Sequence, residues 1–328
     1  MKAINVIRQD DDNRLEIEET TTPKPAKDEL LIKIEATAVN RADLLQRTGN
    51  YPPPQGASNI LGLEMAGIVE ETGKEVTEWE KGDRVFALLS GGGYAEYCTI
   101  HKDMAMPVPD ELSFEEAAAI PETFFTAFQA IDWLGKLQEG ETILIHAAGS
   151  GVGTSAIQLA HHLYDARILG TAGKDHKLET AKELGAEFAY NYKTQNYAEE
   201  IINDIGTDSV DLVIDFVGQP YWHKNMEILA TDGRVVYLSF LGGHKVEEIS
   251  LIPILRKRLS IMGSTLRSRS LDYKIDLTQD FKQQTLSLFN NQTLAPVVDS
   301  VYDWSETEQA HQRMQNNKNT GKIVLTGM

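Results

Sequence analysis

The stretch that decides the fold is Glu141-Thr142-Ile143-Leu144-Ile145-His146-Ala147-Ala148-Gly149-Ser150-Gly151-Val152-Gly153. A short apolar run leads into three glycines, and apolar residues at helical spacing follow as far as Leu163. The pattern predicts a strand that turns tightly into a helix, with backbone N–H groups and the positive end of the helix dipole above the turn. Such a turn suits a phosphate, although the spacing is not the usual G-x-G-x-x-G, and a strand–helix turn without a ligand gives a similar pattern.

Strands and helices alternate after residue 141, which predicts a parallel sheet. The expected strands are residues 142–146, 167–171, 188–191, 210–215, 234–238 and 260–264. Helices are expected between them, for example at 175–184 and 197–205, each closed by a glycine. Six strands in this rhythm predict a doubly wound dinucleotide-binding domain and favour the phosphate interpretation of the turn.

The rest of the chain shows a different pattern of expected strands and helices. Residues 1–120 read as short strands broken by turns, as in a β-rich domain, and residues 291–328 contain strand, helix and strand patterns that would suit a return to it. We therefore expect an α/β protein of two domains, with residues 121–290 forming the dinucleotide-binding domain.

Composition narrows the classes of function. The 328 residues include 31 Lys and Arg against 49 Asp and Glu, a net charge of −18 that argues against general binding of nucleic acid or anionic membranes. The first residues lack a signal-peptide pattern, and no run is long enough to cross a membrane. A single cysteine, Cys98, excludes an internal disulfide and a cysteine-ligated structural zinc. The expectation is a soluble, cytoplasmic protein without a metal.

The end of the second predicted strand bears on the choice of nucleotide. NAD-binding domains place an acidic residue there for the ribose 2′-hydroxyl, whereas this chain has Gly173, followed by Lys174 and Lys177. A small residue with nearby lysines favours a 2′-phosphate, and therefore NADPH. Asp175 would weaken that binding, and the lysines also suit an ordinary exposed helix start. Tyr192, after the third strand, would flank the phosphate or only pack.

Several motifs occur in an order that resembles the zinc-independent quinone oxidoreductases of the medium-chain dehydrogenase/reductase superfamily. They are Asn40-Arg41-Ala42-Asp43, Tyr51-Pro52-Pro53-Pro54, Leu61-Gly62-Leu63-Glu64-Met65-Ala66-Gly67, Gly82-Asp83-Arg84-Val85-Phe86-Ala87, Phe114-Glu115-Glu116-Ala117-Ala118-Ala119-Ile120-Pro121, Ser150-Gly151-Val152-Gly153 and Leu266-Arg267-Ser268-Arg269. The resemblance covers essentially the whole chain. The common turn of these enzymes reads A-x-x-G-x-x-G, and Ser150 replaces its middle glycine here, as in the stress-inducible subgroup of the family.

The resemblance implies a GroES-like catalytic domain at 1–120 completed by 291–328, and a Rossmann NADPH-binding domain at 121–290. It also implies a homodimer whose sixth strands pair. It assigns Tyr51 and Asn40 to the catalytic site and Arg41 and Asp43 to the nicotinamide end, with a structural role for Asp43 as the alternative. The remaining expected cofactor contacts are Ser150, Gly151, Val152, Phe240, Leu241, Gly242, Ser264, Thr265 and Leu266. Arg267 and Arg269 would line the pocket mouth or be surface charges.

The residue types at two positions bear on whether the protein binds a catalytic zinc. Zinc-dependent relatives carry a cysteine and a histidine where this chain has Asn40 and Leu63, so no catalytic zinc is expected and Glu64 is expected to be structural. Hydride transfer without a Lewis acid suits a quinone, which delocalises the developing charge. Tyr51 would then hydrogen-bond the acceptor oxygen, with the acceptor in the interdomain cleft, or it would only pack against the prolines.

Two other functions remain open at this point. The first is an NADPH-dependent enoyl reductase, in which Tyr51 protonates the enolate of an activated alkene. The second is a non-catalytic cofactor-binding protein or RNA binder with a local basic patch at Arg256-Lys257-Arg258.

Overall fold

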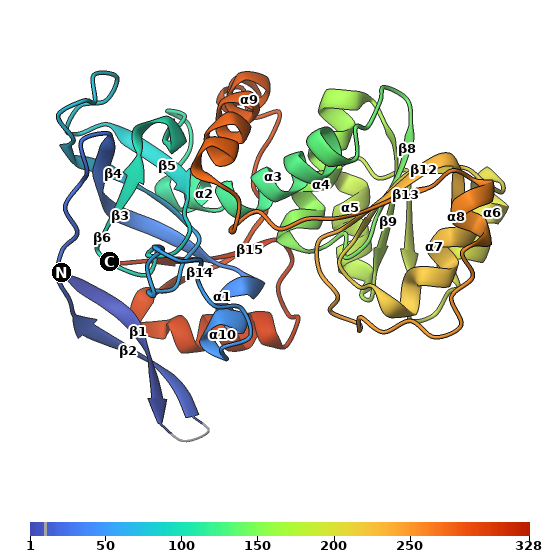
Figure 1. The fold of residues 1–328 in the computed structure, drawn as a ribbon, viewed down its shortest axis with the longest axis horizontal. Helices are drawn as coiled ribbons and strands as arrows, with labels where there is room; N and C mark the ends of the chain where they lie inside the picture. The colour runs from blue at the N-terminus through green and yellow to red at the C-terminus, as the bar shows by residue number, and fades with distance from the viewer. Residues whose placement is uncertain (10–11) are drawn as a thin grey trace. The chain divides into compact units, whose positions relative to one another are not determined.

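The predicted strand–turn–helix forms from β8 (Thr142–Ile145) and α4 (Gly151–Tyr164). The computed structural model describes residues 1–9 and 12–328, and these divide into two units (Figure 1). Unit 1 comprises Met1–Phe125 and Leu266–Met328, and unit 2 comprises Thr126–Thr265. Unit 2 is therefore continuous in sequence, and unit 1 is assembled from both ends of the chain.

Unit 2, all of whose residues are described, contains one six-stranded parallel sheet. Its other strands are β9 (Arg167–Ala172), β10 (Phe188–Asn191), β11 (Val210–Asp215), β12 (Leu229–Tyr237) and β13 (Ser260–Gly263). The order β10-β9-β8-β11-β12-β13 is the doubly wound order, with its switch point between β8 and β11. The predicted strands are confirmed, except that β12 begins five residues early, at Leu229.

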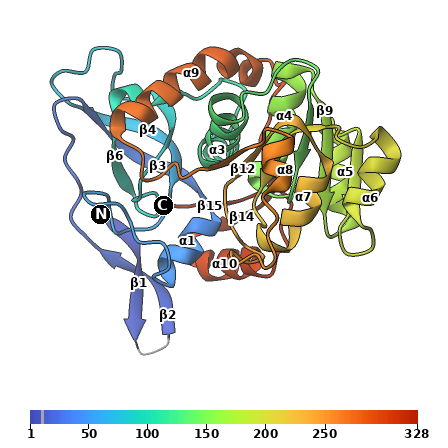
Figure 2. The same ribbon diagram turned by 45° about the vertical axis from the view of Figure 1, so that its right-hand side comes forward.

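Helices cover both faces of this sheet (Figures 1 and 2). Besides α4 they are α5 (Asp175–Glu183), α6 (Tyr197–Ile205), α7 (Trp222–Ile228) and α8 (Ile252–Arg256). A 3₁₀ turn spans Gln219–Tyr221, and a π-helical segment spans Gln129–Leu134. The core between sheet and helices contains Leu144, Leu169, Val213 and Val235, all fully buried. Because parallel strands are covered on both faces, they carry continuous apolar runs, which is what made them readable in the sequence.

Unit 1 is built on a largely antiparallel sheet with the order β14-β15-β3-β4-β5-β7, in which β6 also pairs with β3. The strands are β3 (Glu29–Val39), β4 (Glu64–Thr72), β5 (Arg84–Leu88), β6 (Tyr97–His101), β7 (Met106–Pro107), β14 (Val298–Asp303) and β15 (Lys322–Thr326). A separate hairpin pairs β1 (Lys2–Gln9) with β2 (Asp12–Glu19). Unit 1 is therefore β-rich and takes β14 and β15 from the C-terminal part of the chain.

The helices of unit 1 include α1 (Arg41–Arg47), α2 (Phe114–Ala118), α9 (Leu271–Asn290) and α10 (Thr307–Gln315), and α3 (Pro121–Phe128) begins in it. Short 3₁₀ turns span Lys102–Met104 and Trp304–Glu306. The sequence analysis assigned α9 to the dinucleotide-binding domain, whereas the structure groups it with unit 1. The reason is packing: the rings of Phe281 and Phe289 of α9 contact those of Phe125 and Phe124 of α3, with centroids 4.4 and 5.1 Å apart.

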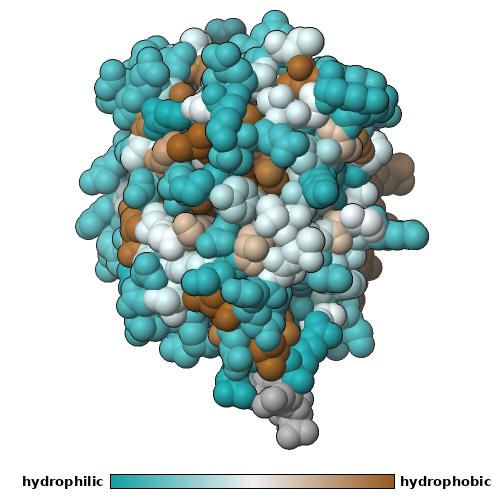
Figure 3. Space-filling model, turned by 90° about the vertical axis from the view of Figure 1, so that its left-hand side faces the viewer, coloured by the Kyte–Doolittle hydropathy of each residue, from teal (hydrophilic) through white to brown (hydrophobic). Residues whose placement is uncertain are grey.

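The surface drawn in Figure 3 is mostly hydrophilic, with hydrophobic side chains only in small scattered groups. Within residues 1–9 and 12–328, no helix is both long and apolar enough to cross a membrane.

Candidate active site

The glycine-rich turn of unit 2 has the local geometry of an anion site. Ser150 caps α4, and its Oγ accepts a hydrogen bond from the N–H of Gly153 at 3.0 Å, which leaves the hydroxyl proton available to a ligand. A Cβ on Gly153 would lie 2.4 Å from the carbonyl oxygen of Ala147, so only glycine permits this close approach of helix and strand. The turn thus presents Ser150, Gly151 and Val152 at the N-terminus of a 14-residue helix.

The end of β9 lies beside this turn. The aliphatic stem of Lys177 packs against Gly149, with three carbons within 2.8 Å of where a Cβ would stand. A Cβ on Gly173 would lie 2.7 Å from the hydroxyl of Tyr192 and 2.9 Å from the Cε of Lys193, so these two side chains cover the glycine. Lys193, the residue after Tyr192, was not identified from the sequence.

Lys174 and Asp175, which follow Gly173 in the sequence, belong to the same candidate site. Lys174 caps α5 with an extended backbone. Asp175, which would oppose a 2′-phosphate, accepts a hydrogen bond at 3.0 Å from the side-chain amide of Asn191. That bond holds its carboxylate toward the end of β10.

The two loops after β12 and β13 are well fixed. The N–H groups of Leu241 and Gly242 already donate to the carbonyl oxygens of Phe216 and Val217, at 3.0 and 2.9 Å. Any contact of these residues with a cofactor would therefore use carbonyl oxygens or side chains, and the side chains of Phe240 and Leu241 are more than half exposed. Ser264 donates its hydroxyl to Gln129 at 2.6 Å, with Thr265 next in the chain, while Leu266 is buried in unit 1.

Unit 1 holds a buried polar network around Glu64, the first residue of β4. Its Oε1 accepts hydrogen bonds from Lys322 Nζ at 2.6 Å and Asn40 Nδ2 at 2.7 Å, and its Oε2 accepts one from the backbone N–H of Glu122 at 2.8 Å. Lys322 also donates to Asn40 Oδ1 at 2.7 Å. Glu64 is fully buried and Lys322 nearly so, so this ion pair is shielded from water. The side chain of Asn40 is engaged on both sides by the pair.

Arg41 and Asp43 make contacts within unit 1. Arg41 Nη2 donates to the carbonyl oxygen of Met314 and to Asn317 Oδ1, at 3.1 and 2.8 Å. Asp43 is fully buried, and its carboxylate accepts the N–H groups of Asn40 and Gly62. Burial raises the pKa of Asp43 to about 6, against the effect of those two backbone bonds. These contacts fix the start of α1 and give Asp43 a structural role.

Tyr51 lies over a buried arginine. The guanidinium carbon of Arg267 is 5.4 Å from the centre of the Tyr51 ring. Arg267 also donates through Nε to the carbonyl oxygen of Ser90 at 2.9 Å and through Nη2 to Gln46 Oε1 at 2.7 Å. Its Nη1 is buried without a hydrogen-bond partner among the residues the structure describes. Burial is the main cause that raises the pKa of Tyr51, so the phenol stays protonated and can donate a hydrogen bond.

Glu122 is a second residue that the sequence analysis missed. It lies in the first turn of α3, and the residue as a whole is intermediate in exposure. Burial is the largest cause that raises its pKa to about 8, followed by the negative charge of Glu64. A signal for it exists in the sequence, because it is an acid within the otherwise apolar segment Ala117-Ala118-Ala119-Ile120-Pro121-Glu122-Thr123-Phe124-Phe125.

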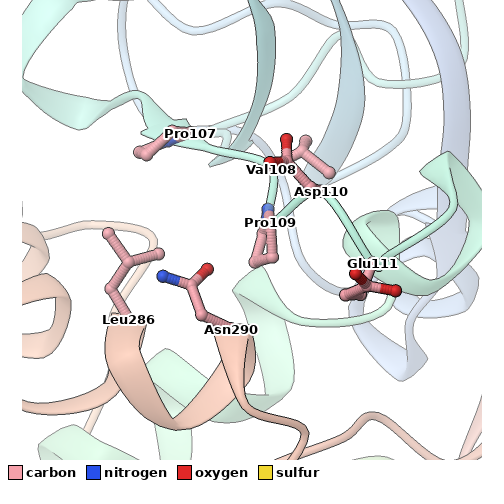
Figure 4. Close-up of a pocket in the computed structure, with 7 residues that line it drawn as sticks. All are labelled: Pro107, Val108, Pro109, Asp110, Glu111, Leu286 and Asn290. Carbon is pink, nitrogen blue, oxygen red and sulfur yellow. The ribbon is translucent and has the colours of Figure 1, made fainter.

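Described residues of unit 1 line at least two hollows. One, of about 330 Å³, lies between residues 107–111 and the end of α9 (Figure 4). It contains none of the residues singled out from the sequence. A second, of about 540 Å³, is lined by the loop from Pro54 to Ser58, by residues 88–92, and by the basic side chains Arg267, Arg269 and Lys274. Arg267 therefore connects this hollow to Tyr51.

The basic patch at residues 256–258 is largely neutralised. Lys257 forms an ion pair with Asp208 and donates to the carbonyl oxygens of Met226, Glu227 and Leu229. Arg258 pairs with Asp232 through two hydrogen bonds. These contacts compete with any phosphate backbone for the two cations, which weakens the RNA-binding hypothesis.

Comparison with known proteins agrees with this architecture. Residues 26–110 match the family described as alcohol dehydrogenase GroES-like domain, and residues 151–291 match the family described as zinc-binding dehydrogenase. Quinone oxidoreductase of Sus scrofa is 31% identical over 99% of this chain and 97% of its own length. The chain belongs to the quinone oxidoreductases of the medium-chain dehydrogenase/reductase superfamily.

Solved structures of the superfamily share the fold over the whole length. Escherichia coli quinone oxidoreductase complexed with NADPH is 27% identical and has a TM-score of 0.87, with all of both chains covered. CurK enoyl reductase is also 27% identical with a TM-score of 0.87, covering 99% of this chain and 98% of its own. The resemblance and the two-domain fold inferred from the sequence are thus confirmed. As a member of this superfamily, the chain is an oxidoreductase that uses a nicotinamide dinucleotide.

The name of one matched family raises the question of zinc. A catalytic zinc in proteins takes thiolate, imidazole and carboxylate ligands. Asn40 and Leu63 stand where zinc-dependent relatives carry a cysteine and a histidine. The neighbouring carboxylate of Glu64 forms an ion pair with the ammonium of Lys322 at 2.6 Å. Among the described residues, no three His, Cys, Asp or Glu side chains group as metal ligands would. The donor set around Glu64 therefore does not fit a catalytic zinc.

Proposed function

We propose that this protein reduces quinones with hydride from NADPH. The observation that carries the proposal is the polar cluster of unit 1, in which Tyr51 and Arg267 lie together and an ammonium group occupies the place beside Glu64. Without a Lewis acid, the acceptor itself must spread the negative charge that hydride transfer creates, and a quinone does so. The names of the related proteins support the same substrate class.

The choice of NADPH rests on unit 2. Bound NADPH supplies the hydride. Ser150 and the N–H groups at the start of α4 would hold its pyrophosphate. Gly173 stands where NAD-binding domains carry an acid, and Lys174, Lys177, Tyr192 and Lys193 lie around that corner. Cationic and hydroxyl groups in this arrangement favour a 2′-phosphate.

On the acceptor side, Tyr51 would donate a hydrogen bond to one quinone oxygen, and Arg267 would favour negative charge there. Asn40 contributes by positioning, because both ends of its side-chain amide are bound to Glu64 and Lys322. Arg41 and Asp43 hold α1, which follows Asn40 directly. Phe240, Leu241, Gly242, Ser264, Thr265 and Leu266 remain proposed contacts of the nicotinamide end.

The direct test is NADPH oxidation by the purified protein with simple quinones, after treatment with a chelator. We expect turnover that the chelator leaves unchanged and that Tyr51→Phe slows about tenfold, the effect of one lost hydrogen bond. Tyr302→Phe is the control, since that partly buried tyrosine of β14 lies outside the cluster and lines neither hollow. A protein that oxidises no NADPH with any quinone would contradict the proposal.

The similarity to CurK enoyl reductase favours a second candidate, the reduction of an activated alkene such as an enoyl thioester. The same residues serve it, with Tyr51 facing the enolate oxygen. Values of kcat/KM for a panel of quinones and enoyl thioesters decide between the two. A preference of more than about tenfold, or 1.4 kcal/mol, for either class identifies the acceptor.

We also propose that the protein is a homodimer in which the β13 strands of two copies pair. β13 stands at one end of the unit 2 sheet, and its residues Ser260, Ile261 and Gly263 are exposed. Pairing of two such end strands would satisfy their outward N–H and C=O groups and cover Ile261.

A further inference from the structure

The hollow of about 540 Å³ in unit 1 has a positively charged wall. Arg267, Arg269 and Lys274 line it, and all three lie in the segment that leads into α9 and begins it. Glu29 is the only carboxylate among the described residues that line the hollow, and it accepts a hydrogen bond from the backbone N–H of Ala26 at 2.9 Å. Positive charge therefore gathers here, although the chain as a whole carries a net charge of −18.

Two of these cations are fixed on one residue, Ser90. Arg267 Nε donates to the carbonyl oxygen of Ser90 at 2.9 Å, and Lys274 Nζ donates to Ser90 Oγ at 2.7 Å. The other hydrogen bond of Arg267 goes to Gln46 Oε1, so among the described residues both cations bond only neutral groups. The charge of Arg267 lowers the pKa of Lys274, after the larger effect of burial. An anion bound beside both groups would offset this repulsion.

Hydrogen-bond donors remain for such an anion. An ammonium has three N–H groups, and Lys274 uses one of them on Ser90. Arg267 is only 6% exposed, and its Nη1 has no partner among the described residues, so its charge is poorly screened by water. Leu271 also lines the hollow as the first residue of α9, and the positive end of this 20-residue helix adds to the potential. Asp272, the acid of that first turn, is exposed and does not line the hollow.

Arg267 joins the hollow to the proposed acceptor site. Its guanidinium carbon lies 5.4 Å from the centre of the Tyr51 ring, and the loop from Pro54 to Ser58, which follows Tyr51, forms part of the wall of the hollow. A molecule whose ring binds at Tyr51 can therefore extend a short side chain into the hollow. The volume is in the range of small-molecule sites, and the cations favour a carboxylate at the end of that side chain.

We propose that the hollow binds a carboxylate carried by the acceptor, with Lys274 as its main counter-ion and Arg267 placed between the carboxylate and the quinone ring. This inference rests on the proposed function and narrows its substrate class to quinones with an acidic side chain. Lys274 then determines specificity and takes no part in hydride transfer.

The direct test compares two quinones that differ in charge but hardly in size. One is a naphthoquinone with a propionic acid side chain, here called the quinone acid, and the other is the corresponding propionamide. We expect kcat/KM for the quinone acid to exceed that for the amide about tenfold, the effect of charge-assisted hydrogen bonds. Raising the salt concentration from about 0.05 M to about 0.5 M should reduce this ratio, because mobile ions screen the attraction.

Lys274→Met removes the counter-ion and keeps most of the aliphatic stem. We expect the ratio of the two kcat/KM values to fall to about one in this variant, whereas Lys274→Arg, which retains a cation, should keep most of the preference. Lys282→Met is the matched control, because Lys282 is another partly buried lysine of α9 that lines neither hollow. Its ratio should equal that of the unaltered protein.

Equal kcat/KM values for the quinone acid and the amide in the unaltered protein would overturn the inference. A preference that survives Lys274→Met would overturn it as well, since another group would then bind the carboxylate. A preference that salt does not reduce would do the same, because it would not arise from charge, and this measurement needs no variant.

Titration calorimetry with NADP⁺ in place of NADPH separates this inference from the proposed function, because no turnover is required. The quinone acid should bind about tenfold more tightly than its amide, and propionate alone should bind far more weakly. Propionate that bound as tightly as the quinone acid would make the hollow a site for free carboxylates and overturn the assignment. A protein that prefers the quinone acid but oxidises no NADPH with any quinone would contradict only the proposed function. Turnover of both quinones without any preference would contradict only the assignment of the hollow.

Discussion

Lys322 determines whether the buried carboxylate of Glu64 can be tolerated. The pair is shielded from water, with only 3% of the Lys322 side chain and none of the Glu64 side chain exposed. Removing one partner of a buried pair leaves an uncompensated charge in a medium that solvates it poorly. The two residues are thus a structural unit on which the position of Glu122 depends.

We predict that Lys322→Met lowers the free energy of unfolding by about 3–5 kcal/mol, measured by urea denaturation. Lys81→Met removes an exposed ion pair with Glu70 and should cost at most about 1 kcal/mol. Adding Glu64→Gln to Lys322→Met should recover most of the loss, because the stranded charge is then gone. Equal effects of Lys322→Met and Lys81→Met would show that the buried pair contributes no more than a surface pair.

At the scale of elements, α5 connects the dinucleotide turn to the 2′-phosphate corner. Lys177, in its first turn, packs its stem on Gly149 of the turn. We predict that Lys177→Met, which keeps most of that stem, raises the KM for NADPH about tenfold. This is the effect expected from the loss of one charge-assisted hydrogen bond. The KM for NADH should change little, since NADH has no 2′-phosphate.

Lys182→Met is the control for that measurement, because Lys182 is an exposed residue in the last turn of the same helix. It should leave both KM values unchanged. If Lys177→Met raised the KM for NADPH and NADH equally, Lys177 would support the turn rather than recognise the phosphate.

The elements of unit 2 were predictable because each parallel strand carries its own apolar run and each helix its own end signals. The bounds of α6 match the prediction, and Gly206 ends it at a positive φ of 94°. The assignment of α9 failed for a different reason. Its sequence predicts an amphipathic helix but does not say which core its apolar side meets, and Phe281 meets unit 1.

Residues of the candidate site could be predicted only where a local sequence motif indicates their role. Ser150 and Gly173 stand in a readable strand–turn–helix pattern. Glu122 does not, because its character depends on Glu64, 58 residues earlier, and on Lys322 near the other end of the chain. Long-range electrostatics of this kind leaves only a weak trace in the sequence, an acid among apolar neighbours.

At the scale of the whole molecule, we predict a mass of twice 36.5 kDa in sedimentation equilibrium. Ile261→Lys should shift the protein toward monomer, because a charge on an end strand opposes edge-to-edge pairing. Ile17→Lys places the same charge on a partly exposed isoleucine of β2 in unit 1 and should leave the dimer intact. A monomer in the unaltered protein would contradict the proposed β13 pairing.

The ion pair between Glu64 and Lys322 also sets an order of events during synthesis on the ribosome. The two residues are 258 positions apart, and all of unit 2 is made between them. At a synthesis rate of about 5–20 residues per second, roughly 10–50 s separate the synthesis of Glu64 from that of Lys322. Unit 2 can therefore fold while unit 1 is still incomplete, and the nascent N-terminal strands must stay soluble, or be held by chaperones, until β15 emerges.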